Sequence, residues 1–340
     1  MHTVPGGQSP GWHSDNSTSY AAFWDFKDHQ DRTVWLWQEI AKHYHGNSWV
    51  AGYNPINEPC DPEHVRLLHF YKRLEAEVRK VDPDHILWLD GNTYSMDFSA
   101  FKQDDVLPNC VYAIHDYSTM GFPTGVPYRG TPEQKQTLER QFSRKCEFHK
   151  KYGTPIWNGE FGPVYADSRY EPDAEGTNNW RYELLGEQLR IYNVSKISWT
   201  IWLYKDIGLQ GMVHTSPDSA WNKLIQPFLE KKRRLQLDSW GKYPSKEVEK
   251  VLGPLVAWID KVSPTAGAQY PTPWDLQKHV DRAVLQTFLA DSLQNEFAEL
   301  FKGKTEAELE ELARSFHFDK CVQREGLNRI MSDHAKIEGH

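Results

Sequence analysis

The sequence predicts an α/β protein built as a (β/α)8 barrel, and three observations lead to this fold class. Short apolar runs alternate with stretches of helical periodicity along the first two thirds of the chain, which is the pattern of parallel βα units. The apolar runs carry polar, reactive side chains at their C-terminal ends. The chain between Glu58 and Glu160 has room for about three units of roughly 30 residues, the unit length of such a barrel.

Local signals predict each element of this pattern. Apolar residues at helical spacing predict a helix over residues 28–44, and Asp61 as N-cap with Pro62 as first helical residue predicts the start of a second. Further helices are predicted from Thr131 to about Lys151 and over residues 178–193. Strands are predicted in "WVAGYNPINEP", "HILWLDGN", "CVYAIHDY", "TPIWNGEFG" and "ISWTIWLYKDIG", at residues 49–59, 85–92, 110–117, 154–162 and 197–208.

The last third of the chain shows helical periodicity only. Helices are predicted in "SKEVEKVLGPLVAWIDKV", "PWDLQKHVDRAVLQTFLADSLQNEFAELF" and "TEAELEELARSF". We therefore predict two regions, a (β/α) barrel over residues 1–215 and a helical C-terminal extension over residues 216–340 that packs on the barrel.

Composition narrows the classes of partner. The chain has 340 residues, of which 39% are hydrophobic, so it is long enough to bury a large core. Its 13% aromatic content, with 14 Trp and 16 Tyr, suits the flat faces of sugars as well as a core. The net charge of -8 and the lack of a basic stripe exclude nucleic acid as a partner. Without a long apolar window or a signal-peptide pattern, the sequence as written predicts a cytoplasmic protein that does not enter membranes.

The sequence predicts neither a metal nor a cofactor. Its four cysteines, Cys60, Cys110, Cys146 and Cys321, form no CxxC pair, which argues against a disulfide framework or a zinc site and favours buried free thiols. No HExxH motif is present, and the "PGGQ" turn near the N-terminus lacks the following GK[ST] of a phosphate loop.

Two glutamates stand at the ends of predicted strands, where a barrel assembles its active face. Glu58 follows Asn57, and Glu160 ends "WNGE". Two carboxyl groups at one rim are what glycoside hydrolysis requires, one to protonate the leaving oxygen and one to attack or to activate water. Burial is expected to keep Glu58 protonated, and donors such as His115 and Tyr117 are expected to keep Glu160 ionised.

The motifs "NPINEP", "IHDY", "WNGEFG" and "SWTIW", in this order within residues 1–210, resemble glycoside hydrolase family 5, the cellulase-like retaining enzymes with a TIM barrel. The resemblance implies that Glu58 is the acid/base and Glu160 the nucleophile. It also implies the substrate-binding and orienting roles of four further residues: Asn57 at the sugar 2-hydroxyl, His115 and Tyr117 at the carboxylates, and Trp202 under the attacked sugar.

The string "HTVPGGQ" resembles the family's third strand, whose His contacts substrate, and this implies that His2 binds substrate. Strands one and two, and the Arg that the family places on strand two, have no counterpart here, so we expect an incomplete barrel. Its open edge predicts self-association, and a longer true N-terminus would permit secretion. Trp12, in "WHSDN", is expected to border the sugar site.

The function expected from these motifs is a retaining β-glycoside hydrolase that acts on β-glucosides or β-glucans, a β-linked carbohydrate substrate. A catalytically impaired carbohydrate-binding barrel is the alternative, favoured if the missing strands abolish the chemistry. A metal-dependent barrel hydrolase would need a ligand set that the sequence does not supply.

Overall fold

The computed structural model describes residues 1–16, 18–238, 240, 245–266 and 275–336. The chain divides into two compact units. The first unit comprises Met1–Asp116, Gln141–Gly159 and Ile259–Ala283, and the second comprises Tyr117–Arg140, Glu160–Trp258 and Val284–His340. The sequence predicted a different division, at residue 215, between a barrel and a helical extension. These two compact units do not test it, so it stays a prediction.

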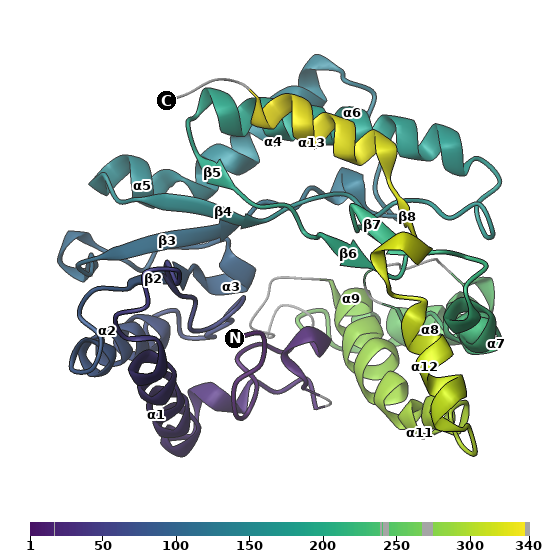
Figure 1. Cartoon of the computed structure of the whole chain (residues 1–340), viewed down its shortest axis with the longest axis horizontal. Helices are drawn as coiled ribbons and strands as arrows, with labels where there is room; N and C mark the ends of the chain where they lie inside the picture. The colour runs from purple at the N-terminus through teal and green to yellow at the C-terminus, as the bar shows by residue number, and fades with distance from the viewer. Residues whose placement is uncertain (17, 239, 241–244, 267–274, 337–340) are drawn as a thin grey trace. The chain divides into compact units, whose positions relative to one another are not determined.

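A parallel sheet forms the centre of the first unit. Its strands β1 (Gly52–Tyr53), β2 (Ile86–Asp90), β3 (Cys110–His115) and β4 (Ile156–Glu160) are neighbours in chain order, and Figure 1 shows β2, β3 and β4 side by side. β1 pairs in parallel with β2, with Gly52 opposite Ile86, and β2 pairs in parallel with β3. Consecutive strands that are parallel neighbours require a crossover between them, so this order confirms the predicted α/β class.

The crossovers of the first unit are helical and amphipathic. Helices α1 (Lys27–Tyr44) and α2 (Arg66–Arg79) pack on each other, and α1 agrees closely with the predicted helix over residues 28–44. Both bury an apolar stripe, which in α2 consists of Leu67, Leu68, Phe70, Tyr71, Leu74 and Val78. Among the described residues, this unit also contains the α-helices α3 (Asn92–Ser95), α5 (Glu147–Tyr152) and α9 (Leu276–Val280).

Helix α2 begins later than the sequence predicted. Asp61 is not its N-cap and Pro62 is not helical, because the chain turns through residues 62–65 before the helix starts at Arg66. Asp61 still serves the helix from a distance. One oxygen of its buried carboxylate accepts hydrogen bonds from the backbone N–H groups of Arg66 (2.7 Å) and Leu67 (3.1 Å). The carboxylate therefore satisfies the free donors of the first turn without occupying the cap position.

The helix predicted from Thr131 to Lys151 is two helices in the structure. α4 (Pro132–Lys145) and α5 are separated at Cys146, whose ψ of 3° is not helical. The predicted start is confirmed, since the Thr131 hydroxyl accepts a hydrogen bond from the Gln134 backbone N–H at 3.3 Å. The end follows from Gly153, which adopts a left-handed φ of 65° and caps α5.

The second unit combines helices with short strands. Its strands are β5 (Ser198–Trp199), β6 (Lys205–Asp206), β7 (Val213–Thr215) and β8 (Cys321–Gln323). Its helices are α6 (Ala174–Val194), α7 (Ala220–Arg234), α10 (Ala290–Ser292), α11 (Gln294–Glu299), α12 (Glu306–Arg314) and α13 (Glu325–Ala335), with a π-helical stretch mostly inside it at Asp281–Leu289. α4 and α8 (Lys246–Val262) contribute residues to both units.

Two predictions for this unit need correction. The single strand expected over residues 197–208 is two short strands, β5 and β6, and the region after residue 215 is not purely helical, because β8 pairs antiparallel with β7. Arg324 explains the second difference: its backbone N–H donates to the Met212 carbonyl, and its guanidinium donates to the carbonyls of Gly211 and Gly208. Of the predicted helix over residues 273–301, the first two residues lie outside the described residues.

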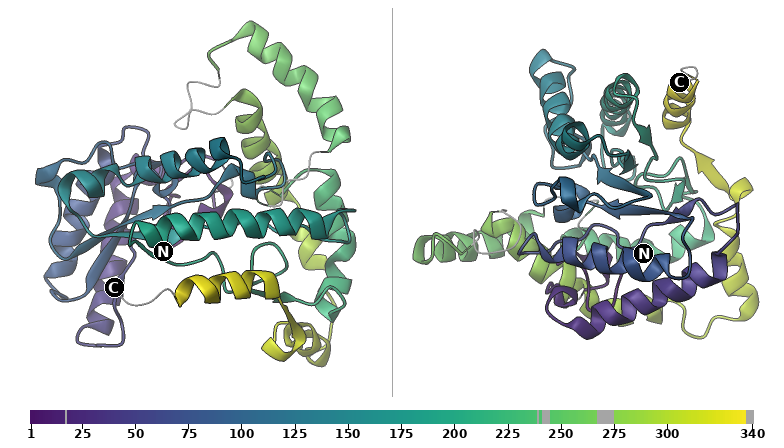
Figure 2. Two further views of the ribbon diagram at one scale, coloured as in Figure 1. Left: turned by 90° about the horizontal axis from the view of Figure 1, so that it is seen from above. Right: turned by 90° about the vertical axis from the view of Figure 1, so that its left-hand side faces the viewer.

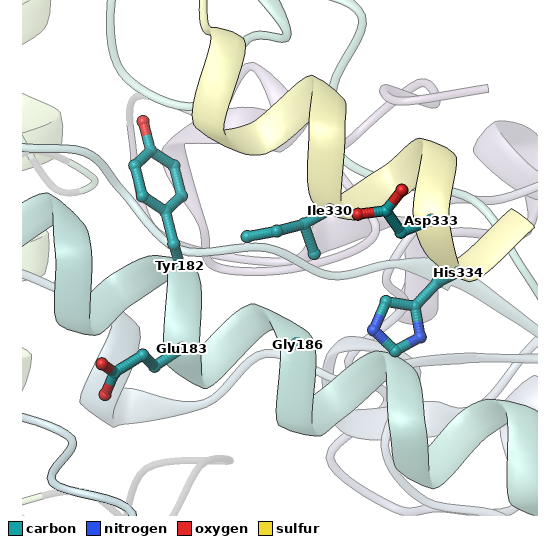
Figure 3. A pocket seen from close by; sticks show the side chains of 6 residues that line it. All are labelled: Tyr182, Glu183, Gly186, Ile330, Asp333 and His334. Carbon is teal, nitrogen blue, oxygen red and sulfur yellow. The ribbon is translucent and has the colours of Figure 1, made fainter.

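Helices α6 and α13 lie side by side, as the two views of Figure 2 show. Between them is a shallow pocket of about 300 Å³, which Figure 3 shows from close by. Its lining comes from both helices: Tyr182, Glu183, Gly186, Ile330, Asp333 and His334. Neither of the predicted catalytic glutamates belongs to this lining.

The predicted thiol state is confirmed for three of the four cysteines. Cys60, Cys110 and Cys146 are free and buried, and Cys321 is free and partly exposed. Burial raises the pKa of each of the three buried thiols to about 12, which keeps them protonated and unreactive near neutral pH. Within the described part of the chain, no helix combines the length and the apolar character needed to cross a membrane.

Candidate active site

Glu58 is held by two imidazoles in the first unit. It follows β1 in the chain, and its side chain is only 13% exposed. Nδ1 of His115, at the end of β3, lies 2.8 Å from Glu58 Oε1, and Nε2 of His13 lies 3.1 Å from Oε2. Both oxygens of this largely enclosed carboxylate therefore face a ring nitrogen.

The protonation of Glu58 differs from the expectation. Burial alone would raise the pKa of Glu58, as the sequence suggested, but the imidazoles of His115 and His13 outweigh it and hold the pKa well below its usual range. The expected protonation by burial is thus wrong for this arrangement.

A buried glutamine joins two of the predicted site residues of this unit, His2 and Asn57. Gln8, from the "PGGQ" turn, donates from Nε2 to the carbonyls of His2 (2.7 Å) and Asn57 (2.8 Å). The turn before it needs glycine, because Gly6 and Gly7 have φ of 82° and 70° and a Cβ on Gly6 would lie 2.4 Å from the ring of His29. The string that suggested a substrate-binding His2 thus also ties His2 to the Asn57–Glu58 segment.

His115 is positioned by the chain that follows it. Lys145, at the end of α4, is buried, and its ammonium group donates to the His115 carbonyl (3.0 Å) and to the Asp116 carboxylate (2.7 Å). The Asp116 backbone N–H donates to Asn158 on β4. A buried ion pair with further hydrogen bonds fixes the end of β3, and with it the imidazole that meets Glu58.

Glu160 is held by a phenol in the second unit. The hydroxyl of Tyr117 donates to Glu160 Oε2 at 3.0 Å. The Tyr117 ring packs edge to face on Trp240, with ring centroids 5.1 Å apart. A carboxylate that accepts a hydrogen bond from a phenol is favoured in its ionised form.

Trp202 stands next to the strand that ends in Glu160. Its backbone N–H donates to the carbonyl of Phe161, the residue after Glu160, at 3.0 Å. Gly162 permits this approach, because it has a φ of 137° and a Cβ there would lie 3.1 Å from the Trp202 carbonyl oxygen. The structure thus brings together Tyr117, Glu160 and the Trp202 backbone in one unit.

The predicted site residues fall into two groups, one in each unit. Glu58 and His115 are in direct contact, His2 and Asn57 are joined through Gln8, and Trp12 packs edge to face on His13 with centroids 5.7 Å apart. The prediction that all of the site residues line one cavity stays a prediction.

Sequence reasoning missed His13 and Gln8 as individual residues. Both lie within strings that it singled out, "WHSDN" and "PGGQ", so the signal was present at the level of the motif. The contact of His13 depends on how the loop folds: the Ser14 hydroxyl donates to the carbonyls of Ser9 and Gly11, and the Asn16 side chain donates to that of Ser9. Such a fold is not encoded in any periodicity.

Comparison with known proteins identifies the class. The family model described as cellulase (glycosyl hydrolase family 5) matches residues 2–208. A protein named beta-xylosidase from Phanerodontia chrysosporium is 47% identical over 342 residues, which cover 99% of this chain and 72% of that protein. The protein is thus a glycoside hydrolase. It belongs to glycosyl hydrolase family 5, as the motifs predicted, and the predicted α/β barrel class agrees with this family.

More distant proteins are also similar. Cellodextrinase A from Ruminococcus flavefaciens is 23% identical over 175 residues, 46% of this chain and 51% of that protein. A solved structure titled as that of a glycoside hydrolase aligns with a TM-score of 0.48 and 20% identity, over 61% of this chain and 65% of the other. The chain thus spans half to two thirds of the length of these two proteins.

Proposed function

We propose that this protein is a retaining β-glycosidase in which Glu58 is the acid/base and Glu160 the nucleophile. One observation carries the proposal furthest: both oxygens of the Glu58 carboxylate face imidazole nitrogens, those of His115 and His13. Membership of family 5 supports it, since double displacement by two carboxylates is the family's chemistry.

In the first step Glu58, sharing its proton with the imidazoles, transfers it to the glycosidic oxygen while a Glu160 oxygen attacks the anomeric carbon. The bond between that carbon and the leaving oxygen breaks, and a covalent glycosyl-enzyme forms. The Tyr117 hydroxyl donates to Glu160 Oε2, and this contact favours the carboxylate form that the attack requires. Loss of a proton from Glu58 is favoured by the same imidazole contacts that lower its pKa.

In the second step the Glu58 carboxylate takes a proton from water as the water attacks the glycosyl-enzyme, and Glu160 leaves as a carboxylate. Two inversions at the anomeric carbon give net retention. This mechanism requires the two carboxyl groups to lie about 5 to 5.5 Å apart in the active enzyme.

For the substrate we propose β-xylosides or β-glucosides. The sequence favoured β-glucosides or β-glucans, and the relative that is 47% identical is named a beta-xylosidase. These two sugars differ only by the hydroxymethyl group on C5. A comparison of aryl β-xylosides with aryl β-glucosides, as kcat/KM on the same leaving group, decides between them.

The test of mechanism compares three variants on an activated aryl β-glycoside. Glu160→Ala is expected to lose essentially all turnover, because the attacking atom is gone. Glu58→Ala is expected to form the glycosyl-enzyme, to stall at its hydrolysis, and to recover turnover when azide replaces water as the nucleophile. Glu63→Ala, which removes an exposed carboxylate close in sequence, serves as the control.

Two results contradict the proposal. Appreciable turnover by Glu160→Ala removes the nucleophile assignment. Glu58→Ala without azide recovery removes the acid/base assignment. NMR of the sugar product, which shows the anomer that forms first, tests the retaining mechanism separately. If the unaltered chain binds β-linked oligosaccharides but turns over no aryl glycoside, it acts as a carbohydrate-binding protein instead.

A further inference from the structure

Asp90, at the C-terminal end of β2, is a buried carboxylate that the mechanism above does not use. It is 1% exposed. A buried charge is costly unless donors surround it, and Asp90 has three: Asn54 Nδ2 donates to Oδ1 at 2.7 Å, and the Ser95 hydroxyl (2.7 Å) and the Glu58 backbone N–H (3.0 Å) donate to Oδ2. One of these donors is the backbone of the proposed acid/base itself.

Glu58 needs this anchor because its backbone is strained. Its φ is 49°, in the left-handed region, which is unfavourable for a residue with a side chain. The backbone conformation sets the direction in which the side chain leaves the chain. The hydrogen bond to Asp90 therefore fixes the path along which Glu58 reaches His115 and His13.

The segment after β2 has a strained backbone, and this conformation places a hydrogen-bond donor beside Asp90. Thr93, Tyr94 and Ser95 all have left-handed φ values, 53°, 60° and 59°, and none of them is glycine. Strain of this kind persists only when its surroundings over-determine it. The turn is closed by the Ser95 N–H on the Gly91 carbonyl at 3.0 Å, and it delivers the Ser95 hydroxyl to Asp90.

Asp90 also faces the second support of Glu58. Nε2 of His115 lies 3.8 Å from Asp90 Oδ2, while Nδ1 of the same ring lies 2.8 Å from Glu58 Oε1. The imidazole thus stands between two carboxylates. Because the two ring nitrogens face two different carboxylates, the Asp90 charge influences which nitrogen carries the proton and how the ring is oriented.

From this geometry we propose that Asp90 is a positioning residue for the acid/base: it fixes the Glu58 backbone directly and orients the His115 ring that holds the Glu58 side chain. The proposal rests on the acid/base assignment of Glu58 made above. Asp90 itself takes no part in proton transfer. Its loss should weaken acid catalysis selectively, because a misplaced acid no longer reaches the leaving oxygen.

The experiment measures kcat/KM for Asp90→Asn on two aryl β-glycosides, one with a dinitrophenyl and one with a phenyl leaving group. Dinitrophenolate departs with little protonation, whereas phenol requires a proton from the acid. Misplacement of a catalytic group by about 1 Å costs on the order of 100-fold in rate. We expect a loss of about 100-fold on the phenyl glycoside and at most a few-fold on the dinitrophenyl glycoside.

Asp82→Asn is the matched control. Asp82 is a fully buried carboxylate of the same unit, and it accepts hydrogen bonds from the Tyr53 hydroxyl (2.6 Å) and the backbone N–H groups of Asp84 and His85 (3.1 Å each). The same substitution there removes the same charge but touches neither Glu58 nor His115. We expect the control to lower thermal stability and to change kcat/KM by the same factor on both substrates.

Each outcome decides one question. If Asp90→Asn loses the same factor on both substrates, as Asp82→Asn does, Asp90 is merely structural and the proposal is overturned. If Glu58→Ala itself shows no difference between the two substrates, the acid/base assignment fails, which is a separate result. If Asp90→Asn does not fold, Ser95→Ala removes one donor and keeps the charge, and it must show the same selectivity in weaker form; equal losses on both substrates overturn the proposal.

Discussion

The carboxylate of Glu58, which we propose as the acid/base, is surrounded by groups that favour its ionised form, although a general acid must carry a proton. The two requirements are compatible if the proton is shared. His13 lies 3.1 Å from one oxygen and His115 lies 2.8 Å from the other, so a proton lost to the leaving group is replaced over a short distance. Interacting groups of this kind titrate as a set, and the pH dependence of the rate reports the set rather than Glu58 alone.

His13 should therefore control the pH dependence of acid catalysis. Because the His13 imidazole lowers the pKa of Glu58, its removal should raise that pKa, and the acid should remain protonated to higher pH. In His13→Ala the alkaline limb of the kcat/KM profile on a phenyl glycoside is expected to move to higher pH. His2, His115 and Asp90 remain in place, so the limb should shift without disappearing.

The matched control for this prediction is His43→Ala, which removes an exposed imidazole from α1. Its pH profile should superimpose on that of the unaltered protein. An alkaline limb that stays in place, or moves to lower pH, in His13→Ala contradicts the assigned direction. His13→Gln keeps an N–H donor without a titrating ring. Its alkaline limb should lie between that of the unaltered protein and that of His13→Ala.

At the scale of elements, the start of α2 depends on a side chain that lies outside the helix. Asp61 reaches the first turn of α2 across an intervening turn, and its own backbone is paired with Asn92, whose side chain donates to the Asp61 carbonyl and accepts from its N–H. The helix start is thereby linked to the end of β2, next to Asp90. Local capping signals predicted that Asp61 stabilises the start of α2. They did not predict the intervening turn, in which His64 has a φ of 62°.

Asp61→Ala is expected to lower the free energy of unfolding by about 2 kcal/mol, because it removes the acceptor of two first-turn N–H groups and of the Arg66 side chain. Urea denaturation followed by far-UV circular dichroism measures this loss. Asp104→Ala, at an exposed carboxylate, is the control and should change stability by less than about 0.5 kcal/mol. Equal stability of the two variants contradicts the capping role of Asp61.

At the scale of the whole molecule, what was predictable from the sequence is the order of the buried strands and the residues at their ends. Apolar runs predicted β2, β3 and β4, and the motifs singled out Glu58, His115, Tyr117 and Glu160. The sequence offered both His115 and Tyr117 as donors to Glu160, whereas in the structure His115 contacts Glu58 and Tyr117 contacts Glu160. What was not predictable depends on long-range pairing. The three residues of β8 carry no periodicity of their own, and they form a strand because β7, more than 100 residues earlier in the chain, offers an edge. Similarly, His13 meets Glu58 only because the loop of residues 9–16 closes on itself.

Arg324 is the residue that makes one such long-range connection, and the second unit should depend on it. Its guanidinium is almost fully buried, donates to the carbonyls of Gly211 (3.1 Å) and Gly208 (3.1 Å), and lies 4.2 Å from the centroid of the Tyr165 ring. Arg324→Ala leaves both carbonyls without this donor and is expected to cost about 3 kcal/mol of stability. It should also make the chain after residue 320 more accessible to limited proteolysis, since β8 and α13 lie next to this anchor.

Arg324→Lys retains the charge but not the planar fork of donors, so it should recover only part of the stability. Arg314→Ala, at an exposed guanidinium of α12, provides the control for loss of an arginine and should be nearly neutral. If Arg324→Ala and Arg314→Ala unfold at the same urea concentration and are cleaved at the same rate, then Arg324 does not hold β8 in place, and the pairing of β7 with β8 must be stable on its backbone hydrogen bonds alone.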